Sequence, residues 1–387
     1  MVTRILKKVV ATNMQYYPVL SLNGPRQSGK STLVKKVFPR LPYANLENPV
    51  EREFATTDPL GFLQQYPKGA VIDEAQYVPE LFSYIQVLTD ENPTLKFVLT
   101  GSQNFIMHEK IAQSLAGRVS INTLLPFSFA ELKKGKFLPA TLNELLFNGS
   151  YPRLYDKNIP ATTYYANYVN TYIERDIQAL INSSNLSQFI KFISLCAGRA
   201  GQIVNMVSLA NDVGVSSVTI NNWLAILQRS YVIYLLQPYY NNFNKRLTKN
   251  PKLYFYDTGL LCYLLGLQKA NDITNHFAKG AIFENYVLIE LLKQHYNTGL
   301  RPQVFYLQSN NQKEIDFILQ QGTSLTAIEV KSSSTPDASM FKNLSFLDEL
   351  NGLENRKVVV YAGEKDTVRK QGLLLGWKSL GKLYGEI

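Results

Sequence analysis

A glycine-rich run lies between an apolar stretch and an amphipathic stretch near the start of the chain. Residues 19–23 are mostly apolar, the run Gly-Pro-Arg-Gln-Ser-Gly-Lys-Ser occupies 24–31, and a helical pattern follows. Glycines at the first and sixth positions allow backbone angles that other residues resist, so successive N–H groups can turn inward at the start of a helix. The run therefore predicts a strand–loop–helix unit that binds phosphate groups.

This loop carries the groups that bind a nucleoside triphosphate. Lys30 is expected to reach the β- and γ-phosphates, and the Ser31 hydroxyl is expected to bind Mg²⁺. We expect the whole loop to surround the phosphates, namely Gly24, Pro25, Arg26, Gln27, Ser28, Gly29, Lys30, Ser31 and Thr32. The sequence thus predicts ATP and Mg²⁺ as ligands.

Two adjacent carboxylates follow a second apolar run. Residues 69–76 read Gly-Ala-Val-Ile-Asp-Glu-Ala-Gln, a buried-strand pattern that ends in acids, as a Walker B element does. Asp73 would hold the Mg²⁺ shell, and Glu74 would orient or deprotonate the attacking water. The alternative is an ordinary strand end with two solvated acids. With the upstream loop present, the pattern favours ATP hydrolysis.

A third apolar run, residues 97–104, also ends in polar residues. Open parallel sheets place ligand contacts at the carboxyl ends of their strands. Ser102 or Gln103 would therefore sense the γ-phosphate, with Ser102 as the first choice.

The first part of the chain alternates apolar runs with helical patterns, which is typical of an α/β fold with a parallel sheet. The expected strands are Val19 to Asn23, Tyr43 to Leu46, Ala70 to Asp73, Lys96 to Thr100 and Val119 to Leu124. We divide the chain into residues 1–135, 136–184, 185–260 and 261–387.

Seven motifs in order, GPRQSGKST, VIDEAQ, LTGSQN, SLAGR, PFSFAEL, GSYPRL and YIERDI, resemble a large prokaryotic group of AAA+ family ATPases. The resemblance covers nearly the whole chain. It implies a P-loop AAA+ core at 1–135, a helical lid at 136–184 and a carboxy-terminal domain long catalogued as of unknown function. It also implies that Arg118 reaches the nucleotide of a neighbouring subunit in a homo-oligomer, with a surface or structural arginine as the alternative. Arg153 and Arg175 lie in the lid, where packing or salt bridges are the expected roles.

Residues 185–260 read as a winged helix. Two helical patterns flank Gly214, and Ile220, Trp223, Leu224 and Leu227 share one face of the second. Ser217, Asn221, Asn222 and Gln228 are left facing outward, and a basic tract containing Lys245, Arg246 and Lys249 would form the wing. The formal net charge of +10 also favours an anionic partner. DNA is the expected partner, and a protein partner is the alternative.

The final segment contains two strand patterns joined at a Gly-containing turn. Asp316 lies on the first strand, while Glu329 and Lys331 lie two residues apart on the second, so all three can converge at one sheet edge. This is similar to the D…E-x-K core of the restriction-endonuclease-like fold, where two acids bind Mg²⁺ and the lysine aligns water. Glu284, on an apolar helix, is similar to a helical glutamate of archaeal Holliday-junction resolvases. The alternative is an inactive copy of this fold used for assembly, with Glu329 and Lys331 in a static salt bridge.

The low cysteine content, together with the lack of an expected signal or membrane-spanning run, predicts an intracellular, cytoplasmic protein. The chain has 387 residues and two cysteines, each in an apolar run, which indicates buried thiols without a disulfide framework. No secretory signal and no membrane-spanning run are expected. The three histidines lack metal-site spacing.

Overall fold

The structure is a computed structural model that describes residues 2–102, 114–173, 186–239, 250–308, 314–349 and 355–384. The chain forms two compact units. The first comprises Met1–Phe127 with Arg229–Tyr231 and His295–Leu300, and the second comprises Ser128–Gln228, Val232–Gln294 and Arg301–Ile387. The lid, winged-helix and terminal segments expected from the sequence fall largely within the second unit. Among the described residues, no helix has the length and apolarity needed to cross a membrane.

The first unit contains a parallel five-stranded sheet in the order β2-β3-β4-β1-β5. Every strand begins and ends within one residue of the expected positions. Their bounds are β1 Val19–Asn23, β2 Tyr43–Asn45, β3 Val71–Asp73, β4 Phe97–Gly101 and β5 Val119–Thr123. Because β1 pairs with both β4 and β5, the loop that leaves β1 lies between two neighbouring strand ends.

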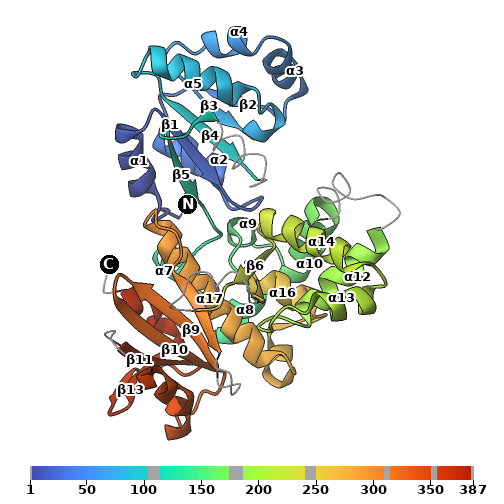
Figure 1. Cartoon of the computed structure of the whole chain (residues 1–387), viewed down its shortest axis with the longest axis vertical. Coiled ribbons are helices and arrows are strands. Elements are labelled where there is room, and N and C mark those ends of the chain that lie inside the picture. Colours follow the sequence, from blue (N-terminus) through green and yellow to red (C-terminus); the bar gives the residue numbers. More distant parts are fainter. Residues whose placement is uncertain are drawn as a thin grey trace. The chain divides into compact units, whose positions relative to one another are not determined.

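Helices cover both faces of this sheet (Figure 1). One face carries Leu20, Val71 and Val98, which pack with residues of α1 and α2. The other face carries Ile72 and Leu99, which pack with residues of α3, α4 and α5. The bounds are α1 Lys7–Tyr16, α2 Lys30–Val37, α3 Pro49–Thr57, α4 Pro59–Gln64, η1 Ala75–Tyr77 and α5 Leu81–Glu91. Successive residues of each buried strand point to opposite faces of the sheet, and helices cover both faces. The first unit is therefore a three-layer α/β sandwich.

The second unit begins with short helices whose ends follow from local sequence. Ser128 and Thr141 each begin a helix with a capping box, and Gly149, with φ of 65°, ends the second of these helices. The bounds are α7 Phe129–Lys134, α8 Leu142–Asn148, α9 Pro152–Lys157, α10 Ala161–Tyr168 and η2 Val169–Ile173. Arg175 lies outside the described residues.

Three helices and a two-stranded antiparallel ladder follow. Gly214, with φ of 86°, ends α13, and the next helix buries the four apolar residues expected to share one face. The bounds are α12 Leu186–Ala197, α13 Met206–Val213, α14 Ser217–Arg229, β6 Ile233–Leu236 and β7 Lys252–Phe255. Lys245, Arg246 and Lys249 lie between the strands in the sequence and outside the described residues.

The rest of the second unit is built on a mixed six-stranded sheet in the order β12-β13-β11-β10-β9-β8. The expected hairpin is present: β9 and β10 are antiparallel and are joined at Gly322, with Ile328 paired to Phe317. The strands are β8 Val304–Gln308, β9 Glu314–Gln321, β10 Ser324–Lys331, β11 Asn355–Tyr361, β12 Thr367–Arg369 and β13 Gly372–Gly376. The helices are α16 Thr258–Leu264, η4 Ala270–Asn275, α17 Lys279–Asn297, η5 Ala338–Glu349 and η6 Trp377–Tyr384.

Candidate functional site

The phosphate loop connects β1 to α2, and both of its glycines are needed. Gly24 and Gly29 have φ of 147° and 94°, and a Cβ atom on Gly24 would lie 2.2 Å from the Leu124 carbonyl oxygen. The Ser28 hydroxyl is buried and has no hydrogen-bond partner among the described residues. A buried polar group without a partner is costly, so this atom fits a loop that a polar ligand completes.

Lys30 folds back onto the loop in this structure. Its Nζ donates hydrogen bonds of 2.9 Å to the carbonyl oxygens of Gly24 and Pro25, and its side chain is buried. Burial lowers the pKa of Lys30, while the nearby carboxylates of Glu74 and Asp73 oppose that shift. The ammonium group therefore lies on the loop, close to Asp73 at the end of β3 and to Glu74, which follows it.

Asp73, at the end of β3, accepts hydrogen bonds from three hydroxyl groups. Ser31 Oγ donates at 2.7 Å, and Tyr43 and Thr100 donate from the neighbouring strands β2 and β4. Burial, together with this bond to Asp73, raises the pKa of Tyr43. The Ser31 hydroxyl and the Asp73 carboxylate offer adjacent oxygen ligands of the kind that Mg²⁺ prefers. The site thus has suitable residues for this ion.

Glu74 has an unusual backbone for a residue with a side chain, with φ of 55° at the start of η1. Its Oε2 accepts a 3.0 Å hydrogen bond from Ser102 Oγ and a bond from the Gln76 amide. The structure therefore brings Ser102, which follows β4, into contact with Glu74, the carboxylate predicted to orient or deprotonate the attacking water. Gln103, the alternative to Ser102, lies outside the described residues.

Arg4 holds the phosphate loop through a hydrogen bond to the backbone of Ser28. Its guanidinium donates to the carbonyl oxygens of Ser28, at 2.7 Å, and Leu125, and it lies 5.1 Å from the centre of the Phe127 ring. The side chain is buried, at 8% exposure. Sequence reasoning missed this residue because a single basic residue before a helix carries no motif. It missed Tyr43 and Thr100 too, although the position of Thr100 at a strand end was a usable signal.

Arg118 forms a two-point ion pair with Asp90 on the surface of the same unit. Its Nε and Nη2 lie 2.5 and 2.8 Å from the two carboxylate oxygens. This hydrogen bonding lowers the pKa of Asp90. Arg118 would have to leave Asp90 before it could reach the nucleotide of another subunit, so a role between subunits stays a prediction.

The acids predicted for a nuclease-like site lie near one another in the second unit. Asp316 Oδ2 accepts a 2.7 Å hydrogen bond from Val330 N, and the hairpin register places Asp316 beside Glu329. Glu329 Oε1 is 2.6 Å from Lys331 Nζ and accepts a 3.0 Å bond from Asn343, while its buried Oε2 has no partner among the described residues. Burial raises the pKa of Asp316, and the charges of Glu284 and Glu329 add to that shift. The salt bridge allowed by the inactive alternative is therefore present.

Lys252 enters this carboxylate cluster from β7. Its Nζ pairs with Glu314 and lies 3.7 Å from Glu284 Oε1, which also accepts a 2.6 Å hydrogen bond from Tyr254. Burial alone would lower the pKa of Lys252, but Glu284 and Glu314 outweigh it and raise that pKa. Burial raises the pKa of Glu284, against the effects of Lys252 and Tyr254. Lys252 follows the basic tract of Lys245, Arg246 and Lys249 in the sequence, but the structure buries it.

Within the described ranges, no three His, Cys, Asp or Glu side chains are placed to hold one metal ion. Glu284, Asp316 and Glu329 do not form such a group, and one oxygen of each acid accepts a bond from the protein: Glu284 Oε1 from Tyr254, Asp316 Oδ2 from Val330 N, and Glu329 Oε1 from Lys331 and Asn343. Their metal-binding and cleavage roles stay predictions.

The outward face of α14 carries the residues expected to contact DNA. Ser217, Asn221 and Asn222 are exposed, while Trp223 packs edge-on against Phe189 of α12 at 5.2 Å between ring centres. Gln228 is also exposed. Arg199, one of the basic residues of this segment, forms an ion pair with Asp212. The face is therefore polar and accessible within its own unit.

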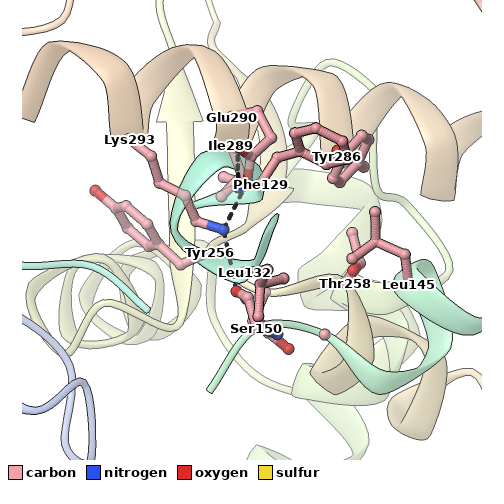
Figure 2. A pocket seen from close by; sticks show the side chains of 12 residues that line it. Phe129, Leu132, Leu145, Ser150, Tyr256, Thr258, Tyr286, Ile289, Glu290 and Lys293 are labelled. Carbon is pink, nitrogen blue, oxygen red and sulfur yellow. Dashed lines mark hydrogen bonds and ion pairs between the residues drawn. The ribbon is translucent and has the colours of Figure 1, made fainter. Parts of the chain in front are cut away.

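A second buried polar network surrounds Ser150, next to Gly149 at the end of α8. Lys293 Nζ, from α17, lies 3.0 Å from Ser150 Oγ and 2.9 Å from Glu290 Oε1, and Glu290 accepts a 2.8 Å bond from Phe129 N (Figure 2). The Ser150 hydroxyl donates in turn to Asp257 at 3.0 Å. The adjoining cavity has a volume of about 10 Å³, which is room for one water molecule and not for a substrate. This serine–lysine pair is therefore structural. Arg153, on α9, is exposed.

Comparisons with known proteins agree with the geometry of the phosphate loop. Residues 16–133 match a family model described as an AAA domain. Residues 139–271 match a domain of unknown function, DUF8612, and residues 279–380 match another, DUF4143. The chain thus has an AAA-like ATPase domain followed by a carboxy-terminal DUF4143 domain. The match confirms the expected AAA-like core and supports the expected binding of ATP.

Two relatives and one solved structure extend this comparison. An uncharacterized protein of Mycobacterium tuberculosis is 28% identical over 354 residues, which cover 90% of this chain and 77% of that protein. An uncharacterized protein of Haemophilus influenzae is 26% identical over 273 residues, covering 67% and 64% respectively. A Walker-type ATPase of Pyrococcus abyssi has a TM-score of 0.46 at 16% identity, covering 67% of this chain and 94% of that one.

Proposed function

We propose that the protein hydrolyses ATP at the phosphate loop and uses the reaction to control binding of DNA by its second unit. The observation that carries the first part is the 2.7 Å hydrogen bond between Ser31 and Asp73, next to Glu74 and Ser102. A helix N-terminus, a lysine, a hydroxyl and two acids thus meet at the carboxyl ends of adjacent parallel strands. This set of groups supports phosphoryl transfer to water.

Each residue of the site has a separate proposed role. Loop N–H groups and Lys30 bind the phosphates, and Lys30 stabilises the charge that develops on the γ-phosphate. Glu74 orients the attacking water and accepts its proton, while Ser102 holds the Glu74 carboxylate and senses the γ-phosphate. Ser31 and Asp73 would hold Mg²⁺, which when bound would neutralise charge on the β- and γ-phosphates.

Replacement of Lys30 by methionine tests the ATPase proposal. The variant keeps a side chain of similar length but loses the ammonium group, so it should bind ATP weakly and hydrolyse it slowly. Lys36→Met, at an exposed position of the same helix, is the matched control. Steady-state phosphate release and equilibrium nucleotide binding measure the two effects. Hydrolysis by Lys30→Met at the rate of the control would refute the proposal.

The DNA part of the proposal is supported by the exposed polar face of α14 and by the formal net charge of +10. Ser217, Asn221 and Asn222 offer hydrogen-bond donors and acceptors of the kind that read base edges and phosphates. We also assign Lys245, Arg246 and Lys249 to contacts with the DNA backbone from their place in the sequence. Binding of this kind weakens steeply with salt, because cations are released from the phosphates.

A change of Asn221 and Asn222 to alanine, and separately of Lys245, Arg246 and Lys249 to glutamine, tests the DNA proposal. Fluorescence anisotropy with a labelled duplex should show weaker binding for both variants. Only the second change should also reduce the dependence on salt. If the wild-type protein does not bind DNA at low salt, or binds as tightly after the lysine and arginine changes, the second unit does not act on DNA in this way.

The second candidate is an ATP-driven switch that presents the same surface to a protein partner. It is favoured by the charge pairing inside the second unit, where Arg199 and Lys252 are neutralised by Asp212, Glu284 and Glu314. Because the acids of the terminal domain do not fit a shared divalent ion, the proposed function stops at binding. Incubation of plasmid and branched DNA with Mg²⁺ or Mn²⁺ tests this limit. Cleavage that Asp316→Ala and Lys331→Ala both abolish would extend the function to a nuclease.

A further inference from the structure

Gln76 is a buried glutamine whose two amide atoms have unequal partners. The residue is 5% exposed, its Nε2 donates to Glu74 Oε2, and its Oε1 is buried without a hydrogen-bond partner among the described residues. Turning the amide over would place its oxygen against the carboxylate, so the bond to Glu74 fixes its orientation. A buried amide oxygen without a donor is costly, and an apolar side chain of the same size would avoid that cost. The contribution of Gln76 is therefore the bond that its nitrogen donates.

The backbone brings these two side chains together although they are only two positions apart. Residues at that spacing do not face each other within a helix. Glu74 lies just before η1 with φ of 55°, a left-handed conformation that is strained for a residue with a side chain, and its carbonyl oxygen accepts a 3.1 Å bond from Tyr77 N. The chain therefore keeps a strained residue at the position where the Glu74 carboxylate meets the Gln76 amide.

Both protein donors bond to the same oxygen of Glu74. Gln76 Nε2 and Ser102 Oγ, the latter at 3.0 Å, donate to Oε2, whereas Oε1 accepts no hydrogen bond from the part of the chain that the structure describes. Because the donors come from η1 and from the residue after β4, they hold the carboxylate from two separate elements. One oxygen is thus held by the protein, and the other is left for a ligand of the site.

We propose that Gln76 is a positioning residue for ATP hydrolysis, which together with Ser102 holds Oε2 of Glu74 and leaves Oε1 to accept the proton of the attacking water. The water oxygen forms its bond to the γ-phosphorus, the bond from that phosphorus to the bridging oxygen breaks, and ADP leaves with the bonding electrons. The water proton passes to Oε1. This role rests on the proposed ATPase function and adds to it one residue and the identity of the accepting atom.

Single-turnover hydrolysis and equilibrium ATP binding test this role with Gln76→Met, which keeps the length of the side chain and loses the amide. Misplacement of a catalytic group slows a reaction by up to about 100-fold, so hydrolysis should slow on this scale while the Kd for ATP stays unchanged. Gln76→Asn keeps an amide on a shorter side chain and should also be slow, which preserves the test if the methionine variant does not fold. Thr89→Val is the matched control, because it removes a buried 2.7 Å hydrogen bond to Ile85 O elsewhere in the same unit. It should hydrolyse ATP at the wild-type rate.

A double-mutant cycle separates positioning of Glu74 from damage to the fold. If Gln76 acts through Glu74, the change Gln76→Met should slow the wild-type protein but should slow Glu74→Gln no further. The same slowing in both backgrounds, or a Gln76→Met protein as fast as Thr89→Val, would overturn the inference and leave the proposed function intact. A Glu74→Gln protein as fast as wild type would instead refute the role of Glu74 in the proposed function, and the role of Gln76 with it.

Discussion

Replacing Arg4 with methionine should destabilise the first unit and weaken its affinity for ATP. The guanidinium donates to the carbonyl oxygens of Ser28 and Leu125, and both bonds are lost in the variant. Hydrogen bonds from a charged donor contribute about 1.5–3 kcal/mol each. Contact with the Phe127 ring adds about 1 kcal/mol. The expected loss of about 4–7 kcal/mol is large beside the roughly 5–15 kcal/mol that stabilises a whole domain.

Urea denaturation followed by circular dichroism, with and without ATP, measures both effects. Ser28 belongs to the phosphate loop, so release of its carbonyl oxygen should raise the Kd for ATP as well as lower the urea midpoint. Lys8→Met, at an exposed position of α1, is the control and should change neither quantity. An Arg4→Met protein within about 1 kcal/mol of wild type and with unchanged ATP affinity would refute the idea that Arg4 positions the loop.

Three further predictions concern other residues. Glu74→Gln should keep its affinity for ATP but turn over roughly 10²- to 10⁴-fold more slowly in a single-turnover assay, and unchanged turnover would remove Glu74 from its role. The pKa values of the Cys196 and Cys262 thiols are raised by burial, so a thiol reagent should label them only after unfolding; rapid labelling of folded protein would show that they are accessible. Arg118→Ala and Asp90→Ala should both leave the melting temperature nearly unchanged because their ion pair is exposed. If only Arg118→Ala slows ATP turnover, and does so at concentrations where subunits associate, Arg118 acts between subunits, whereas equal turnover in both variants excludes that role.

The sheet of the first unit could be predicted because its strands are short apolar runs bounded by polar residues. Asp73, Glu74 and Ser102 each follow such a run, and parallel strands bring these ends to one edge. Lys30 and Ser31 follow from the spacing of the two glycines. Local sequence was sufficient for these residues because the chemistry lies where each strand ends.

Contacts between distant residues could not be predicted in the same way. Arg4 reaches Leu125 across 121 positions, and Lys252 reaches Glu314 across 62. A lysine in a basic stretch looks like a surface residue until the elements that pack around it are known. Hydrophobic periodicity identifies which face of a helix or strand is buried, but it does not identify the polar side chain that enters a core together with its partner.

The two bonds from Lys30 to its own loop have a consequence for ligand choice. The ammonium group is satisfied by the carbonyl oxygens of Gly24 and Pro25. A ligand must therefore offer enough negative charge at the far end of its phosphate chain to draw Lys30 away from both oxygens. Adenosine monophosphate, which is too short to reach that position, should leave both bonds of Lys30 in place. Discrimination by phosphate-chain length thus follows from the bonds between Lys30 and its own loop, and it needs no contact with the base or the sugar.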